Sequence, residues 1–128
     1  MTDTWALAGS AIYATLGSAG TVPIYDTLAP QGTQPPYAIY QLQASRDDYS
    51  FDKSDFSADV TVKMLSNRTW PGEARLTYGH LHDALQDAAL TIPGFTPMRC
   101  RRTSRVEYQD NEKFWHSGGI YRVDFSEE

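Results

Sequence analysis

The most constraining feature of this sequence is a central stretch in which apolar and polar residues alternate strictly. Its apolar positions are Phe56, Ala58, Val60, Val62 and Met64. Successive side chains of a β-strand point to opposite faces of a sheet, so a period of two predicts a strand over Phe56 to Ser66 with one buried and one wet face. The chain must therefore build a sheet that is covered on one side.

A second strand is expected just before this one. Between Tyr37 and Arg46, four apolar positions share one face: Ala38, Tyr40, Leu42 and Ala44. The intervening segment from Asp47 to Asp55 is charged, polar and aromatic together, and we interpret it as an exposed tip. The two strands and this tip form a long antiparallel hairpin.

Three further strands complete the expected sheet. Met98 to Tyr108 and Phe114 to Phe125 form a second hairpin around the polar tip Asp110 to Lys113. Val22 to Leu28 is short, β-prone and carries a proline, which lacks an amide donor, so it indicates an edge strand or an extended linker.

Two amphipathic helices are expected to cover the sheet. The first runs from Trp5 to Ser18, and its apolar face carries Trp5, Ala8, Ile12 and Leu16. The second runs from Glu73 to Ala89. Its core stripe consists of Leu81, Ala84, Leu85 and Ala88, with Leu76 and Tyr78 at the sides.

This order of elements predicts an α+β fold: a mainly antiparallel sheet of four to five strands with two helices packed on one face. The other face carries Thr, Asp, Lys and Arg, so it should be wet or meet a partner. The 128 residues suit a single domain, residues 1–128, large enough to fold without a disulfide or a metal.

Charge and cysteine usage narrow the functional classes. With 11 basic and 16 acidic residues the net charge is -5, which argues against a dedicated nucleic-acid binder. One cysteine excludes an internal disulfide, and no apolar run is long enough for a membrane span. The first residues lack the basic region of a signal peptide. We expect the cytoplasm, or a particle assembled there.

The sequence shows no catalytic constellation, so we expect no enzyme activity, cofactor or metal. His80 and His82 lie two apart on a helix and point to different sides, and His116 is remote in sequence. Cys100 sits mid-strand and is interpreted as a small buried hydrophobe. Phosphate-binding glycine motifs are absent.

Four arginines form the densest basic cluster. They are Arg99, Arg101, Arg102 and Arg105, and the first, second and fourth would line one face of a strand. One interpretation is a patch that meets an acidic protein surface or passing nucleic acid. The alternative is a solvated sheet face paired with acidic neighbours.

The first hairpin tip is the second candidate interface. It contains Asp47, Asp48, Tyr49, Phe51 and Asp52. Exposed aromatic residues among charges often mark protein interfaces. The alternative is that both aromatic side chains fold back onto the hairpin.

The pattern as a whole resembles the tail-completion, or tail-terminator, proteins of long-tailed phages. The most specific stretch is Ala29-Pro30-Gln31-Gly32-Thr33 followed by Pro36-Tyr37. An alanine-rich first helix, the segment with Val22, Ile24, Tyr25 and Asp26, and a closing Gly119-x-x-Arg122-x-x-Phe125 strand agree with it. The break at Asn67 to Gly72, which contains Trp70, has no counterpart in this pattern.

The resemblance implies a structural virion protein that caps the tail tube as a ring, typically of six subunits. Its partners would be further copies of itself, the tail tube protein and a head-completion or stopper protein, with DNA only passing through the bore and no membrane involved. The alternatives are a head-tail connector, stopper or tube protein of the same particle, a small cytoplasmic enzyme using Cys100, His82 or His116, and a monomeric binding module.

Overall fold

The computed structural model describes residues 4–18, 22–49, 54–90 and 92–127. Within them the chain forms two helices and five strands. In order these are α1 (Thr4–Ser18), β1 (Ile24–Asp26), β2 (Tyr37–Tyr49), β3 (Ser54–Ser66), α2 (Gly72–Leu85), β4 (Phe95–Gln109) and β5 (Trp115–Glu127).

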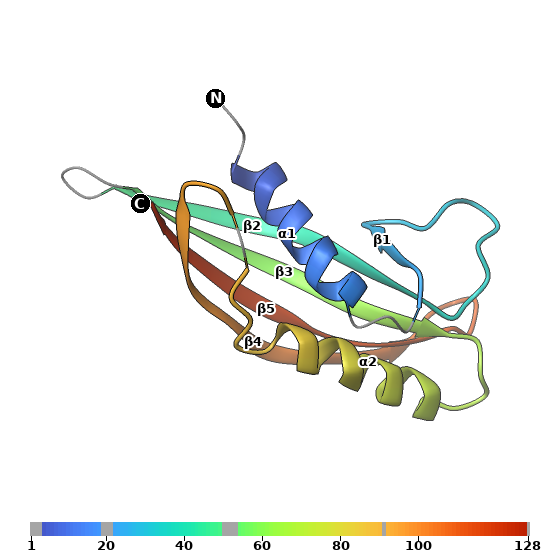
Figure 1. Cartoon of the computed structure of the whole chain (residues 1–128). Coiled ribbons are helices and arrows are strands. Elements are labelled where there is room, and N and C mark those ends of the chain that lie inside the picture. Colours follow the sequence, from blue (N-terminus) through green and yellow to red (C-terminus); the bar gives the residue numbers. More distant parts are fainter. Residues whose placement is uncertain (1–3, 19–21, 50–53, 91, 128) are drawn as a thin grey trace.

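The strands form one curled sheet in the order β1-β2-β3-β5-β4 (Figure 1). β2, β3, β5 and β4 pair antiparallel, whereas the edge strand β1 pairs parallel to β2. The α+β prediction is confirmed, and the sheet is mixed rather than purely antiparallel. The parallel pair forms because the proline-containing loop of residues 27–36 carries the chain back along the sheet before β2 begins.

Both helices lie on the same face of the sheet (Figure 1). α1 contacts β1 and β2, and α2 contacts β3 and β5. The alternating positions of β3 all face the helices and are at most 4% exposed, which confirms the predicted period. Burying a Val, Met or Phe side chain stabilises a fold by about 1.5–3 kcal/mol. Ala8, Ile12 and Leu16 of α1 complete this core as predicted, while the side chain of Trp5 lies outside the described part.

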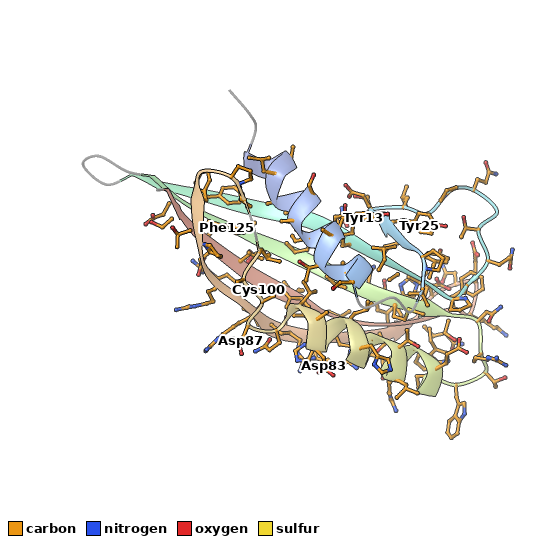
Figure 2. The ribbon with its side chains drawn as sticks, in the orientation of Figure 1. Tyr13, Tyr25, Asp83, Asp87, Cys100 and Phe125 are labelled. Carbon is orange, nitrogen blue, oxygen red and sulfur yellow. The ribbon has the colours of Figure 1, made fainter. Side chains whose placement is uncertain are left out.

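α2 is shorter than predicted, because it ends at Leu85 and not at Ala89. Gln86 is extended, and Asp87 adopts a left-handed conformation with φ of 60°. The Asp87 amide donates to the Cys100 carbonyl at 2.8 Å, so the chain turns onto the outer edge of β4 (Figure 2). A backbone bond to β4 thus replaces another helical turn.

The predicted place of Leu76 beside the core stripe is wrong, since its side chain is 71% exposed. The buried residues of α2 are Ala74, Tyr78, Leu81 and Leu85. Their spacing of three and four residues puts Leu76 on the outer side of the helix.

The hairpin of β2 and β3 is longer than predicted. The ladder continues through Asp47, Asp48 and Tyr49 of β2, which the sequence assigned to the tip. β5 supports this extension from the other side, since Asp55 pairs with Ser126 and accepts a hydrogen bond from its hydroxyl at 2.9 Å. The other two tip candidates, Phe51 and Asp52, lie outside the described residues.

The sheet face opposite the helices is only partly wet. Asp59 and Arg99 are exposed there as expected, but Leu65 and His116 are buried. The β4–β5 turn covers this end: Asp110 Oδ2 lies 2.7 Å from His116 Nε2, and the Tyr108 ring stacks on the imidazole at 4.5 Å between centroids.

Candidate assembly surfaces

The His, Cys, Asp and Glu side chains of the described residues are dispersed over the fold. In that part of the chain, no three His, Cys, Asp or Glu side chains gather as metal ligands, and no helix is long and apolar enough to cross a membrane. Burial, with a smaller contribution from Asp87, raises the pKa of the Cys100 thiol to about 11. Since the thiolate is the nucleophile, a buried neutral thiol agrees with the structural interpretation of Cys100.

The prediction that Arg99, Arg101 and Arg105 share one face is wrong. β4 and β5 change register between Arg102 and Ser104, so Thr103 is an extra residue in β4. A bulge of this kind reverses which face the following side chains take. Arg105 therefore pairs with Gly119 and faces the helices, whereas Arg99 and Arg101 face the opposite side.

Arg99 and Arg101 keep their guanidinium groups at the surface. Arg99 Nε lies 3.9 Å from Asp124 Oδ2, and Arg101 Nε lies 2.9 Å from Asp87 Oδ1. Their side chains remain 58% and 63% exposed. These pairs match the interpretation of an ion-paired, solvated face. Because exposed pairs contribute about 0–1 kcal/mol, a protein partner could still compete for either arginine.

Arg102 and Arg105 instead cover a cluster of polar aromatic side chains that the sequence reasoning missed. Tyr78 and Tyr121 are 2% and 1% exposed, and their hydroxyls lie 2.6 Å apart. His82 Nδ1 lies 2.7 Å from the Tyr121 hydroxyl. Arg102 donates to the Tyr78 hydroxyl at 3.3 Å, and the Arg105 guanidinium lies 4.5 Å from the Tyr78 ring centroid.

Burial is the main influence on the titration of this cluster. It raises the pKa of Tyr121, and the hydrogen bond with Tyr78 adds to the effect. Burial also lowers the pKa of His82, with Arg102 acting in the same direction. The Tyr121 phenol and the His82 imidazole therefore stay neutral near pH 7, and the hydrogen bond between them joins α2 to β5.

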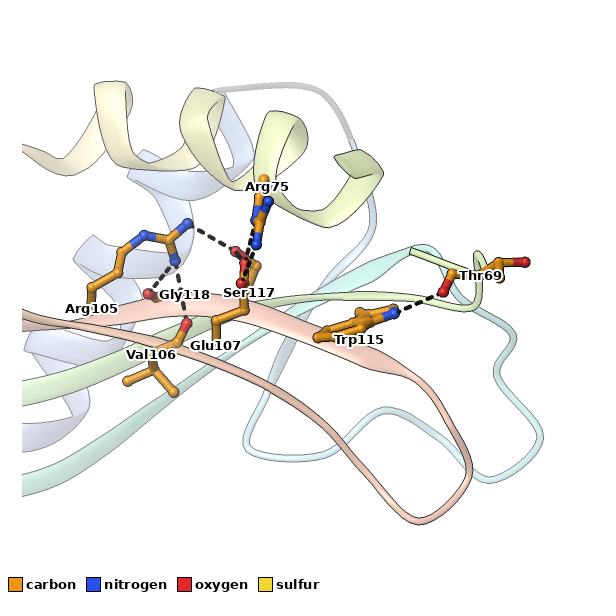
Figure 3. A network of polar contacts seen from close by, with 8 residues as sticks. All are labelled: Thr69, Arg75, Arg105, Val106, Glu107, Trp115, Ser117 and Gly118. Atoms are coloured by element: carbon orange, nitrogen blue, oxygen red, sulfur yellow. Dashed lines mark hydrogen bonds and ion pairs between the residues drawn. The ribbon is translucent and has the colours of Figure 1, made fainter. Parts of the chain in front are cut away.

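An ionic network continues along β4 (Figure 3). Arg75 of α2 makes two hydrogen bonds to the Glu107 carboxylate, at 2.8 and 2.7 Å. Ser117 donates to Glu107 at 3.3 Å and accepts from Arg105 at 3.0 Å, and Arg105 also donates to the Gly118 carbonyl at 2.7 Å. Arg105 thus bonds to β5 on the helix-bearing face of the sheet, whereas Arg99 and Arg101 pair with acidic side chains on the opposite side.

The sequence did hold a signal for the buried cluster. A Cβ added to Gly119 would lie 2.6 Å from the Tyr78 hydroxyl and 2.6 Å from Arg102 Cδ. One added to Gly118 would lie 2.0 Å from the Val62 carbonyl oxygen. Both glycines therefore lie where other parts of the chain approach the β5 backbone closely, which is one reason for glycine inside a strand.

The second candidate surface is the end of the β2–β3 hairpin. The described ends of β2 and β3, with the C-terminal end of β5, extend past both helices (Figure 1). Asp47 and Asp48 lie on this projecting part of β2, opposite Phe56 and Asp55. β5 and β3 lie between the arginine strand β4 and β2, although Arg99 pairs with Asp124, which pairs with Ser57 next to this end.

Comparison with known proteins identifies a family and solved structures of related fold. The family described as "Tail completion protein gp17" matches residues 4–125. A chain in the solved structure "Virion of native gene transfer agent (GTA) particle" superposes with a TM-score of 0.77 and 15% identity, over 95% of this chain and 98% of the other. At that identity the likeness is one of fold. No curated protein matches this chain.

Proposed function

We propose, because the chain belongs to the tail completion protein gp17 family, that it closes the head-proximal end of a phage tail tube as a ring, typically of six subunits. The family makes the chain a structural component of a phage tail and places it in the virion. The finer proposal adds that the ring receives a head-completion or stopper protein and lets DNA pass through its bore.

The observation that carries this proposal is the family match over nearly the whole chain. The fold supports it, because the arginine strand and the projecting hairpin are two different surfaces on one small domain. A contact between unlike surfaces of successive copies closes into a ring when the rotation between copies allows it.

Each surface receives a role in the proposed ring. The hairpin from Asp47 to Asp55, with Tyr49, Phe51 and Asp52 at its end, reaches towards the tube or a neighbouring subunit. Arg99 and Arg101 face a neighbour or the bore. The loop from Gln31 to Pro36 is a rigid turn at a subunit boundary. Arg105 is exposed on the helix-bearing face and donates to Ser117 and to the Gly118 carbonyl, so its proposed role is to hold β4 against β5.

The charge of the chain suits a bore that must release DNA. Each phosphate neutralised by a Lys or Arg adds salt-dependent affinity. The chain carries a net charge of -5, and Arg99 and Arg101 each have an acidic partner. Tight retention of passing DNA is therefore not expected.

Deletion of residues 49–52 tests the proposal, with Asn111→Ala in the opposite turn as a control. The deletion should leave a folded protein, judged by circular dichroism, but electron microscopy should show tails and filled heads that fail to join. The control should give normal particles. Normal infectious particles from the deletion variant would contradict the role of the hairpin.

The position of the protein in the particle separates this proposal from its closest alternative. Antibody labelling should mark only the head-proximal end of isolated tails. Label along the whole tail would indicate a tube protein. Label on filled heads that lack tails would indicate a connector or stopper.

A further inference from the structure

The segment between β3 and α2 exposes a tryptophan that the fold itself does not use. The Trp70 side chain is 74% exposed and directly precedes Pro71, the N-cap residue of α2. Leu76, in the second turn of α2, is exposed to a similar extent at 71%. Tryptophan is among the residue types that most often dominate binding energy at protein interfaces.

The backbone around Trp70 is held in place by contacts on both sides. Trp115 Nε1 donates to the Thr69 carbonyl at 3.3 Å, and the Arg68 amide donates to the Ser66 hydroxyl at 3.2 Å. The Arg68 side chain pairs with Glu73 in the first turn of α2 at 3.0 Å. An exposed side chain on a fixed backbone loses little conformational freedom on binding, which favours it as an anchor.

A hollow of about 280 Å³ lies near the β1 edge of the sheet. It is formed by α1, β2 and the end of β1, on the side where Figure 2 labels Tyr13 and Tyr25. Tyr40 and Leu42 give it an apolar wall, while Ser10, Asp26 and Thr27 supply polar groups. We call it the α1–β1 hollow.

We propose that Trp70 of one copy of this chain inserts into the α1–β1 hollow of the next copy. The volume equals that of about nine water molecules, which suits one large aromatic side chain. Tyr40 and Leu42 can cover the indole ring. Its N–H group needs an acceptor once buried, and the Asp26 carboxylate and the Ser10 hydroxyl can accept it.

The charged groups at the two sites allow a second contact. Arg68, whose side chain is 70% exposed although it pairs with Glu73, stands two residues before Trp70, and Asp26 is exposed at the hollow. A copy that brings Trp70 to the hollow therefore also brings the exposed Arg68 guanidinium towards the Asp26 carboxylate. This inference rests on the proposed function, since a ring supplies the neighbouring copies.

The two partners in this contact are different surfaces. α1, β2 and the end of β1 line the hollow, whereas Trp70 lies in the segment between β3 and α2. The contact is then heterologous: each copy gives one anchor and receives one, as ring closure requires.

Photo-crosslinking in assembled tails tests the contact directly. The photoreactive p-benzoylphenylalanine replaces Trp70 in the full chain, and purified tails are irradiated and analysed by mass spectrometry. Crosslinks should join position 70 of one copy to residues 6–10 or 26–27 of another. The same group in place of Thr103, which is exposed on β4 away from the hollow, is the control and should not crosslink to residues 6–10 or 26–27 of another copy.

Other crosslinks overturn the inference and still report on the ring. Crosslinks to another segment of this chain, or none in tails that contain it, would refute the contact but leave the ring possible. Crosslinks to the tube protein would place Trp70 on the tube instead. Absence of the wild-type chain from purified tails would refute the proposed function itself.

A mixing experiment tests the direction of the contact. Trp70→Ala removes the anchor, and Ser10→Phe fills the hollow from an exposed position of α1. Each variant alone should enter tails at least tenfold less than wild type, whereas Leu28→Ala and Ala14→Phe should enter normally.

An equimolar mixture of Trp70→Ala and Ser10→Phe at high concentration should form heterodimers and nothing larger by native mass spectrometry. Normal entry of either variant, or a mixture without heterodimers, would contradict the proposal.

Discussion

Replacement of Gly119 by alanine tests the packing between α2 and β5. The added Cβ would lie 2.6 Å from the Tyr78 hydroxyl and 2.9 Å from the Ser104 carbonyl oxygen. The Tyr78 hydroxyl is held at 2.6 Å from that of Tyr121, and the Ser104 oxygen belongs to the backbone of β4. Relief of the clash must therefore move α2 away from the sheet or bend β4.

The expected cost follows from these contacts. Overpacking a core costs about 1–3 kcal/mol, and loss of the Tyr78–Tyr121 hydrogen bond adds about 0.5–1.5 kcal/mol. We expect Gly119→Ala to lower the free energy of unfolding by about 2–4 kcal/mol. At an unfolding entropy of about 2.1 cal/mol/K per residue, the 128 residues give about 4 °C per kcal/mol. Tm should therefore fall by about 7–15 °C.

Gly79→Ala is the matched control, because the chemical change is the same and the sign is opposite. No atom lies within 4 Å of the Cβ that alanine would add at Gly79 of α2. Alanine in a helix is favoured over glycine by about 0.5–1 kcal/mol, so Tm should rise by about 2–4 °C. Thermal unfolding followed by circular dichroism at one protein concentration measures both variants. A neutral Gly119→Ala, or equal shifts for the two, would refute this description of the packing.

Three further predictions concern the core, the thiol and the ionic network. Leu81→Ala removes a fully buried side chain and should cost about 2.7–5 kcal/mol by urea unfolding; a cost below 1 kcal/mol would contradict its core position. Iodoacetamide at pH 8 should leave Cys100 unlabelled in the folded protein, because the buried thiol has a pKa of about 11, and should label it in denaturant. Hydrogen bonds from Arg75 lower the pKa of Glu107 below its usual 4.5. Ionised Glu107 therefore stabilises the fold at pH values above 4.5, and this contribution disappears as the pH falls through the lowered pKa. The stability difference between wild type and Arg75→Gln should accordingly shrink between pH 6 and pH 3; a constant difference would indicate that the Glu107 contact contributes nothing.

Local patterns were sufficient for most of the fold. The alternation in β3 predicted the buried face because a strand with one covered face allows no other placement. The apolar spacing in α1 likewise predicted a helix, and the polar residues Asp110–Lys113 predicted a turn. In that turn, the Asp110 carboxylate accepts hydrogen bonds from the amides of Glu112 and Phe114, a side-chain contact of a kind that favours turns.

Features set by tertiary contacts were beyond those patterns. α2 stops at Leu85 because the Asp87 amide bonds to β4, although apolar spacing continues to Ala88. Arg105 changes face because of the bulge at Thr103. No residue type in β4 predicts this bulge. The candidate surface on β4 divides accordingly. Arg99 and Arg101 share one strand face as predicted, whereas the face of Arg105 depends on the register of β4 against β5.

Electron cryomicroscopy of tails isolated before head attachment tests the central claim most directly. The account predicts a single ring of this fold, with six copies, at the head-proximal end of the tube and only there. Tails that end without this ring, or in which the same fold repeats along the tube, would contradict the claim that the chain completes the tail.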